Sequence, residues 1–157
     1  MSIIVLGSTG QVASALKNVL PNAQFFGQAE LNFVQPNFAV LDAYKPAIII
    51  NTAAYTAVDK AESEQELCNQ INHLAVAALA SYCAKNNVLL VQFSTDYVFD
   101  GSGNKPFLEN NTTNLAPVNT YGKTKLAAEQ AIFASGCNYL ILRTSWVYYQ
   151  DRKSTRL

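Results

Sequence analysis

The sequence predicts an α/β fold: a Rossmann-type, doubly wound parallel sheet of about five strands. Three observations carry this prediction. Apolar runs of strand length alternate with helical patterns along the whole chain. Several of these runs are continuously apolar, which is typical of strands that are covered on both faces of a parallel sheet. A glycine-containing turn joins the first run directly to the first helical pattern, as in a βαβ unit.

Length and composition indicate one compact globular domain. The chain has 157 residues, of which 50% are hydrophobic and 14% charged, enough to bury a sizeable core. Eleven basic residues balance eleven acidic ones, so no charge excess points to nucleic acid or to an anionic membrane. No apolar run approaches the ~18 residues that span a bilayer. The start "MSIIVLGS" lacks the features of a signal peptide, so a cytoplasmic protein is expected.

The cysteines and the histidine make a metal site unexpected. Cys68, Cys83 and Cys137 are odd in number, widely spaced and set in apolar or helical contexts. They are expected to be reduced, structural thiols. His73 is the only histidine, which argues against a histidine-based catalytic triad or a histidine-rich metal site.

Five runs are predicted to be strands, and four segments between or after them to be helices. The strands are Ile3–Leu6, Gln24–Phe26, Ile48–Asn51, Val88–Ser94 and Tyr139–Arg143. The helices are Gln11–Leu20, Asn37–Tyr44, about Glu64 to Lys85, and Tyr121–Ser135 with Gly136 as its C-cap. The third helix is predicted to bury one stripe formed by Leu67, Ile71, Leu74, Ala78 and Tyr82. The long irregular stretch Asp100 to Thr120 is expected to be functional.

The stretch "VLGSTGQVA" places Gly7, Gly10 and Ala13 directly after the first strand and at the start of the first helix. Such a turn needs glycine where the backbone turns sharply and where it approaches a pyrophosphate. The helix N-terminus then offers free N–H groups and a partial positive charge to that anion. The turn therefore predicts dinucleotide binding.

Cofactor choice depends on the end of the second strand, where an acidic residue would bind the adenosine ribose. Glu30 and Asn32 are the candidates, and neither is a clean match. No Lys or Arg occurs between Lys17 and Lys45 to hold a 2′-phosphate. This favours NADH over NADPH and leaves both open.

Small and hydroxyl residues follow the third and fourth strands. Ala53 and Ala54 would let the backbone lie against a bound ribose, although simple close packing is an equally good explanation. Ser94, Thr95 and Asp96 lie where ligands bind an open α/β sheet. A hydroxyl there can donate to a substrate carbonyl, and a strand-end cap is the alternative.

In "NTYGKTKLAAEQ", Tyr121 and Lys125 are four residues apart and stack on one helical face. An unperturbed phenol has a pKa of about 10, and a cation within about 4–6 Å lowers such a pKa by roughly 1–3 units. Tyr121 is therefore expected to serve as a proton donor to a carbonyl oxygen. The alternative is an exposed pair with no role. The glycine turn, the hydroxyl after the fourth strand and this pair occur in the order that favours catalysis.

Four stretches resemble the dTDP-4-dehydrorhamnose reductase family of the extended short-chain dehydrogenase/reductase superfamily: "NTAAYTAVDKAESE", "FSTDYVFDG", "PVNTYGKTKLAAEQ" and "LILRTSWVY". The resemblance covers about Met1 to Tyr148. It implies NAD(P)H-dependent reduction of the 4-keto group of dTDP-6-deoxy-L-lyxo-4-hexulose to dTDP-L-rhamnose, a precursor of cell-surface polysaccharides. The implied partner is thus a dTDP-4-keto-6-deoxy sugar.

The resemblance also implies residue roles. Tyr121 would be the proton donor, Lys125 its partner and ribose anchor, and Thr95 the hydrogen-bond donor to the carbonyl. The positions that match cofactor contacts are Gly7, Gly10, Gln11, Val12, Asn32, Phe33, Ala53, Ala54 and Tyr55, together with Tyr121 and Lys125. The positions that match the sugar-nucleotide site are Thr95, Asp96 and Trp146.

One departure from the family pattern and two alternative functions bear on this resemblance. The family often has Asp where this chain has Asn32, which bears on cofactor choice. Sugar-nucleotide dehydratases typically have Glu where Tyr97 follows Thr95-Asp96, so reduction is favoured over dehydration or epimerisation. The other alternative is a non-catalytic NAD(P)-binding regulatory subunit that resembles the one of methionine adenosyltransferase.

The last nine residues, "YQDRKSTRL", do not continue the family pattern. "DRKSTRL" resembles a translated sequencing adapter, so residues 1–148 are expected to be the Rossmann domain and residues 149–157 a non-native tail. The C-terminal strands and the substrate subdomain would then be missing, and the fragment would keep the catalytic residues without most of the substrate pocket. A genuine short variant is the alternative. A homodimer of the full-length protein and a metal at its subunit contact are left open.

Overall fold

The computed structural model describes residues 1–102, 106–109 and 115–148, and the expected tail at 149–157 lies outside them. A five-stranded sheet in the order β2-β1-β3-β4-β5 forms the centre of the molecule. Every pair of neighbouring strands is parallel. The strands are β1 (Ile3–Leu6), β2 (Gln24–Phe26), β3 (Ile48–Asn51), β4 (Leu89–Thr95) and β5 (Tyr139–Thr144). The predicted fold class is therefore confirmed, with strand ends that differ by at most one residue.

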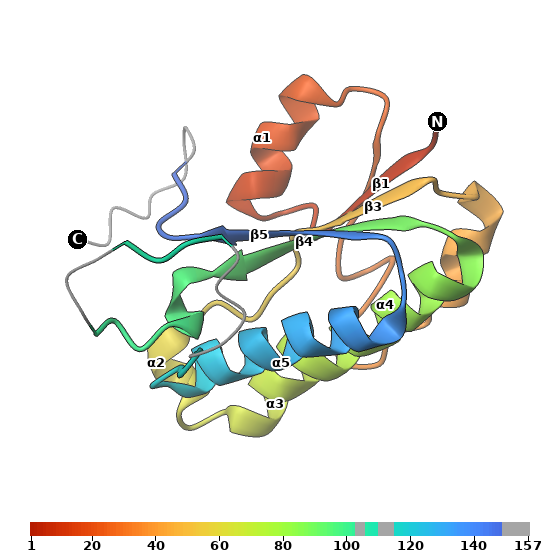
Figure 1. The fold of residues 1–157 in the computed structure, drawn as a ribbon. Helices are drawn as coiled ribbons and strands as arrows, with labels where there is room; N and C mark the ends of the chain where they lie inside the picture. The colour runs from red at the N-terminus through yellow and green to blue at the C-terminus, as the bar shows by residue number, and fades with distance from the viewer. Residues whose placement is uncertain (103–105, 110–114, 149–157) are drawn as a thin grey trace.

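Helices cover both faces of this sheet. Helix α1 lies on one face, and α3, α4 and α5 lie on the other (Figure 1). The α-helices are α1 (Gln11–Val19), α2 (Val58–Ala61), α3 (Gln65–Asn69), α4 (Ala75–Asn86) and α5 (Thr120–Ser135). Two 3-10 helices, η1 (Phe38–Tyr44) and η3 (Asp96–Val98), and a π-helical turn, η2 (Gln70–Leu74), complete the described elements. None of the helices in the described ranges has the length and apolarity to cross a membrane.

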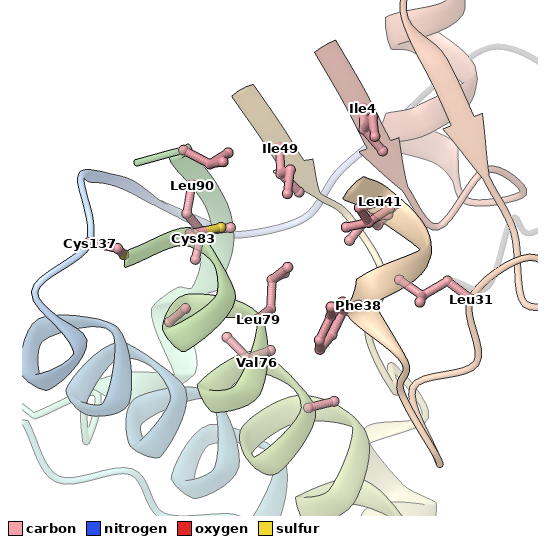
Figure 2. Packing of buried hydrophobic residues seen from close by; sticks show 14 of the residues in the cluster. Ile4, Leu31, Phe38, Leu41, Ile49, Val76, Leu79, Cys83, Leu90 and Cys137 are labelled. Carbon is pink, nitrogen blue, oxygen red and sulfur yellow. The ribbon is translucent and has the colours of Figure 1, made fainter. Parts of the chain in front are cut away.

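The main core lies between the sheet and α4. Ile4, Ile49 and Leu90 project from three neighbouring strands toward Val76 and Leu79 of α4 (Figure 2). All five side chains are at most 1% exposed. Full burial of each such side chain is worth about 1.5–3 kcal/mol, so this contact fixes α4 against the sheet.

The long helix predicted over Glu64 to Lys85 is three elements. Its predicted buried stripe is wrong at Leu67, Leu74 and Ala78, which are exposed, whereas Ile71 and Tyr82 are partly buried against the core. Leu67 and Leu74 are 38% and 46% exposed. The π-helical turn η2 inserts between α3 and α4, where i→i+5 bonds widen one turn. The stripe that is buried lies one position further along the chain: Cys68, Asn72, Ala75, Leu79 and Cys83. A prediction from apolar residues alone leaves asparagine exposed. Here the side-chain amide of Asn72 can be buried because it forms hydrogen bonds with other buried or partly buried groups.

The segment from Asn37 also differs from the prediction. It forms a 3-10 helix rather than an α-helix, and the Asn37 side chain caps it by accepting a hydrogen bond from the Ala39 amide. Helix α5 ends as predicted at Gly136, whose φ of 74° is the left-handed conformation that favours glycine.

Candidate active site

Two neighbouring cavities lie at the carboxyl ends of the strands. The larger cavity, of about 760 Å³, is lined by the β1–α1 turn, the loop after β3, the end of β4, the start of α5 and the segment after β5. The smaller cavity, of about 240 Å³, lies toward the end of β2. Both include Thr9, Gly10, Thr52, Ala53 and Ala54 in their lining. The connections of β1 and β3 leave toward opposite faces of the sheet here, which is where open α/β sheets bind ligands.

The two glycines of the β1–α1 turn have different tasks. Gly7 has a φ of 91°, and a Cβ there would lie 2.7 Å from the Ala53 amide nitrogen, so only glycine fits. Gly10 precedes α1 as its N-cap with a φ of −74°. A Cβ on Gly10 would meet only the Gly7 carbonyl oxygen, at 3.4 Å. The fold therefore requires Gly7, whereas Gly10 leaves open space toward the cavity, where Gln11 and Val12 also lie.

Of the two candidates for binding the adenosine ribose, Asn32 lines the smaller cavity and Glu30 does not. The Glu30 carboxylate accepts a hydrogen bond from the Gly27 amide at 2.7 Å and so closes the turn after β2. Asn32 lines the cavity, and its side-chain oxygen accepts from the Val34 amide at 2.8 Å. Phe33 lines the cavity too and packs edge-on against Phe38 of the core. Among the described residues of this lining there is no lysine or arginine.

The loop after β3 presents Ala53 and Ala54 to both cavities but turns Tyr55 away. The Tyr55 hydroxyl donates to the Glu64 carboxylate at 2.6 Å, and Tyr55 lines neither cavity. The hydrogen bond to Glu64 is the main cause that raises the pKa of Tyr55 to about 12. Apart from Glu30, every other residue predicted to contact cofactor or substrate lines one of the two cavities.

Asn72, which the sequence did not single out, holds this loop in place. Its side-chain oxygen accepts from the Tyr55 amide at 2.8 Å, and its nitrogen donates to the Tyr55 carbonyl at 3.0 Å. The same nitrogen lies 3.4 Å from the Thr124 hydroxyl on α5. Asn72 is 1% exposed and lies in the π-helical turn. It thus connects the loop that lines the cavities with the helix that carries Tyr121 and Lys125.

Replacing Asn72 with leucine is expected to destabilise the protein by about 2–4 kcal/mol, because the buried Tyr55 amide and carbonyl lose their partner. Amide exchange at Tyr55 should accelerate at the same time. Chemical unfolding and hydrogen exchange measure these effects. Asn69→Leu is the matched control, since within the described part of the chain the Asn69 side chain bonds to His73 alone, on the partly buried side of the helix. Equal losses of stability in the two variants would contradict a special role for Asn72.

Hydrogen bonds from polar side chains hold the first turn of helix α5 at the larger cavity. The Asn119 side chain accepts from the Gly122 amide at 2.7 Å. The Glu62 carboxylate accepts from the Thr120 amide at 2.7 Å and from its hydroxyl at 2.9 Å. Tyr121 and Lys125 then line the cavity opposite Thr95 at the end of β4. The structure therefore brings the three predicted catalytic residues together.

The expectation that Lys125 lowers the pKa of Tyr121 is wrong. Burial raises the pKa of Tyr121 to about 12, and a hydrogen bond with Thr95 opposes this only in part. The Lys125 ammonium donates instead to the Phe93 carbonyl at 2.6 Å, and burial lowers the pKa of Lys125 to about 8. The Tyr121 phenol is therefore protonated at neutral pH, the state required of a proton donor.

Of the residues predicted for the sugar nucleotide, Asp96 and Trp146 are exposed at the rim, whereas Thr95 is buried at the end of β4. Asp96 accepts from the Thr95 hydroxyl at 3.1 Å, and Trp146 lines the cavity from the segment after β5 with 74% of its surface exposed. The Tyr97 ring lies edge-on to the Tyr121 ring, with centroids 6.0 Å apart. The space between Thr95 and Tyr121 can hold a carbonyl group between their two hydroxyls. It belongs to the larger cavity, which extends to the N-terminus of α1.

Comparisons with known proteins agree with this arrangement. The family described as RmlD substrate binding domain matches residues 1–156. The dTDP-4-dehydrorhamnose reductase of Escherichia coli K12 is 41% identical, in an alignment that covers 94% of this chain and 52% of that protein. The chain thus spans about half the length of the curated relatives it matches.

Solved structures give the same result. A dTDP-4-dehydrorhamnose reductase from Bacillus anthracis, in complex with NADP, is 34% identical with a TM-score of 0.87, over 97% of this chain and 56% of that one. A dTDP-4-dehydrorhamnose reductase from Clostridium acetobutylicum is 32% identical with a TM-score of 0.89, over 98% and 56% of the two chains. The predicted resemblance to dTDP-4-dehydrorhamnose reductases is confirmed, and the chain belongs to the RmlD substrate binding domain family.

Proposed function

We propose that this chain is the cofactor-binding and catalytic half of an NAD(P)H-dependent reductase. The reaction is reduction of the 4-keto group of dTDP-6-deoxy-L-lyxo-4-hexulose to dTDP-L-rhamnose. The observation that carries the proposal is that Tyr121, Lys125 and Thr95 line the same cavity as the Gly10 turn. Its relatives are named dTDP-4-dehydrorhamnose reductase, and the Bacillus anthracis structure contains NADP. Residues 1–148 form the proposed Rossmann domain.

The proposed chemistry divides the work between the chain and its cofactor. Bound NADH or NADPH supplies the hydride. Tyr121, whose raised pKa keeps its phenol protonated at neutral pH, donates the proton to the carbonyl oxygen. Thr95 donates a hydrogen bond to the same oxygen as charge develops on it. Lys125, whose ammonium is held by the Phe93 carbonyl and which lines the cavity, anchors the nicotinamide ribose.

Binding of the two ligands is assigned to the two cavities. Gly10 and the N-terminus of α1, with Gln11 and Val12 beside them, would hold the pyrophosphate. The adenosine reaches the smaller cavity at Asn32 and Phe33. Asp96 and Trp146 contact the sugar nucleotide. NADH and NADPH both remain candidates: the absence of a cation from the described lining of the smaller cavity favours NADH, whereas the Bacillus anthracis relative holds NADP.

A Gly10→Asp variant tests this assignment. Aspartate is a favoured N-cap, and the space at Gly10 accepts a side chain, so the fold should persist. Its charge would repel a pyrophosphate at the helix N-terminus by about 1–4 kcal/mol, which is about 5- to 1000-fold in affinity. Fluorescence titration with NADH and NADPH measures the loss and ranks the two cofactors.

Gly10→Asn is the matched control, because it has the same shape without the charge. The proposal expects the aspartate variant to bind more weakly than the asparagine variant, with equal thermal stability. Unchanged cofactor binding in a folded Gly10→Asp variant would overturn the assignment of the turn. A cytoplasmic location and the lack of a nucleic-acid partner stay predictions of the sequence, and a homodimer of the full-length protein stays open.

A further inference from the structure

A fully buried carboxylate lies one helical turn beyond Lys125. Glu129 of α5 is 0% exposed and pairs with Arg143 of β5. Its Oε2 accepts from Arg143 Nη2 at 2.6 Å, and its Oε1 accepts from Nε at 3.0 Å. Such a two-point pair fixes the carboxylate in orientation as well as in position. The proposed reaction has no step for either residue.

Strand β4 binds this carboxylate and the Lys125 ammonium at two successive residues. The Ser94 hydroxyl donates to Glu129 Oε1 at 2.5 Å, and the carbonyl of the preceding residue, Phe93, accepts from Lys125 Nζ at 2.6 Å. Residues four apart lie on the same face of a helix. Lys125 and Glu129, which have opposite charges and lie on successive turns of α5, therefore bind to successive residues of β4.

We propose that Glu129 is a positioning residue for Lys125: it holds the ammonium in its charged form at the base of the larger cavity, and Arg143 and Ser94 hold Glu129 in the orientation that does so. The importance of this for cofactor binding depends on the function proposed above. The charge relation between Glu129 and Lys125 does not depend on it.

Burial explains why Lys125 needs such a residue. Its side chain is 3% exposed, and removal from water disfavours the ammonium, which lowers the pKa of Lys125 to about 8. Glu129 is the largest influence in the opposite direction, and Cys68 of α3 adds to it. The other charged or titratable groups nearby are Arg143 of β5, which faces Glu129, and Tyr121 and Asp96, which line the cavity.

A purely structural clamp between α5 and β5 is the competing explanation, because the Glu129–Arg143 pair also joins these elements. The Arg143 guanidinium lies 5.3 Å from the centre of the Phe99 ring, and Phe99 stacks on Phe107 with centroids 4.0 Å apart. A clamp would change stability and leave the ionisation of Lys125 unaltered. The titration of Lys125 itself therefore distinguishes the two explanations.

The test is an NMR titration of the protein labelled with 13C at the lysine ε-carbon, with the Lys125 signal assigned from a Lys125→Arg spectrum. Glu129→Gln keeps an acceptor for Ser94 and removes the charge. The pKa of Lys125 should fall by about one unit or more. Glu62→Gln is the matched control: it removes another carboxylate that anchors α5, through Thr120, and should leave the pKa of Lys125 unchanged.

The double variant Glu129→Gln/Arg143→Gln removes both charges and keeps the result interpretable if the single variant unfolds. It should also lower the pKa of Lys125, but by less than Glu129→Gln, because loss of the Arg143 charge acts in the opposite direction. An unchanged pKa in whichever of these two variants folds, or an equal change in Glu62→Gln, would overturn the inference. Cofactor titration at several pH values is run in parallel. A lowered pKa without any cofactor binding to the wild type would support the role of Glu129 and count against the proposed function.

Discussion

A Tyr121→Phe variant is expected to reduce the 4-keto sugar nucleotide about 10²- to 10⁴-fold more slowly, the usual contribution of a positioned general acid. Phenylalanine keeps the ring and its edge contact with Tyr97 but has no proton to give. Cofactor binding should be largely retained, because of the assigned cofactor contacts only the Tyr121 hydroxyl is lost, and the Gly10 turn and Lys125 are untouched. Single-turnover oxidation of the cofactor measures the effect, in a protein that carries the second half found in the relatives.

Tyr97→Phe is the matched control, since it removes a different phenol from the same cavity. Its rate should stay close to that of the wild type. The pH profile adds a second test. Lys125 is charged below its pKa of about 8 and loses its proton above it, so cofactor affinity should fall as pH rises through 8. Tyr121, with a pKa of about 12, stays protonated over this range. A wild-type rate in Tyr121→Phe would exclude its role as donor.

Gly122→Ala is expected to destabilise the protein by about 2–3 kcal/mol or more, although alanine normally stabilises a helix interior by roughly 1 kcal/mol relative to glycine. A Cβ at Gly122 would lie 2.3 Å from the Tyr97 carbonyl oxygen and 3.0 Å from the Pro117 Cβ. Neither a main-chain carbonyl nor a proline ring moves easily, so α5 and η3 must separate. Chemical unfolding measures the loss.

Lys123→Ala provides the comparison for this variant. Lys123 is exposed on the neighbouring position of α5, so its replacement should change the free energy of unfolding by no more than about 0.5 kcal/mol. Separation of α5 from η3 would also move Tyr121 away from Thr95, so cofactor binding or turnover should fall together with stability. A Gly122→Ala variant as stable as the wild type would show that the contact with Tyr97 yields without cost.

The sequence by itself determined the strands, the fold class and most of the candidate site. Parallel strands buried on both faces must be continuously apolar, and so Ile3–Leu6 and Ile48–Asn51 were predicted to the residue. The glycine turn follows β1 without a gap, which placed Gly7 and Gly10 at the carboxyl edge of the sheet. A helix repeats every 3.6 residues, which placed Tyr121 and Lys125 on one face. These are local rules that need no knowledge of the neighbours.

Tertiary structure decided whatever depends on groups distant in sequence. The buried face of the η2–α4 region was misassigned because burial of Asn72 depends on its bonds to Tyr55, 17 residues away. The orientation of Tyr55 likewise depends on Glu64. The direction of the pKa shift of Tyr121 was set by burial rather than by its helical neighbour Lys125. Desolvation and long-range hydrogen bonds depend on the packed molecule. Hydrophobic periodicity and turn-forming residues depend only on residues that are close in the sequence.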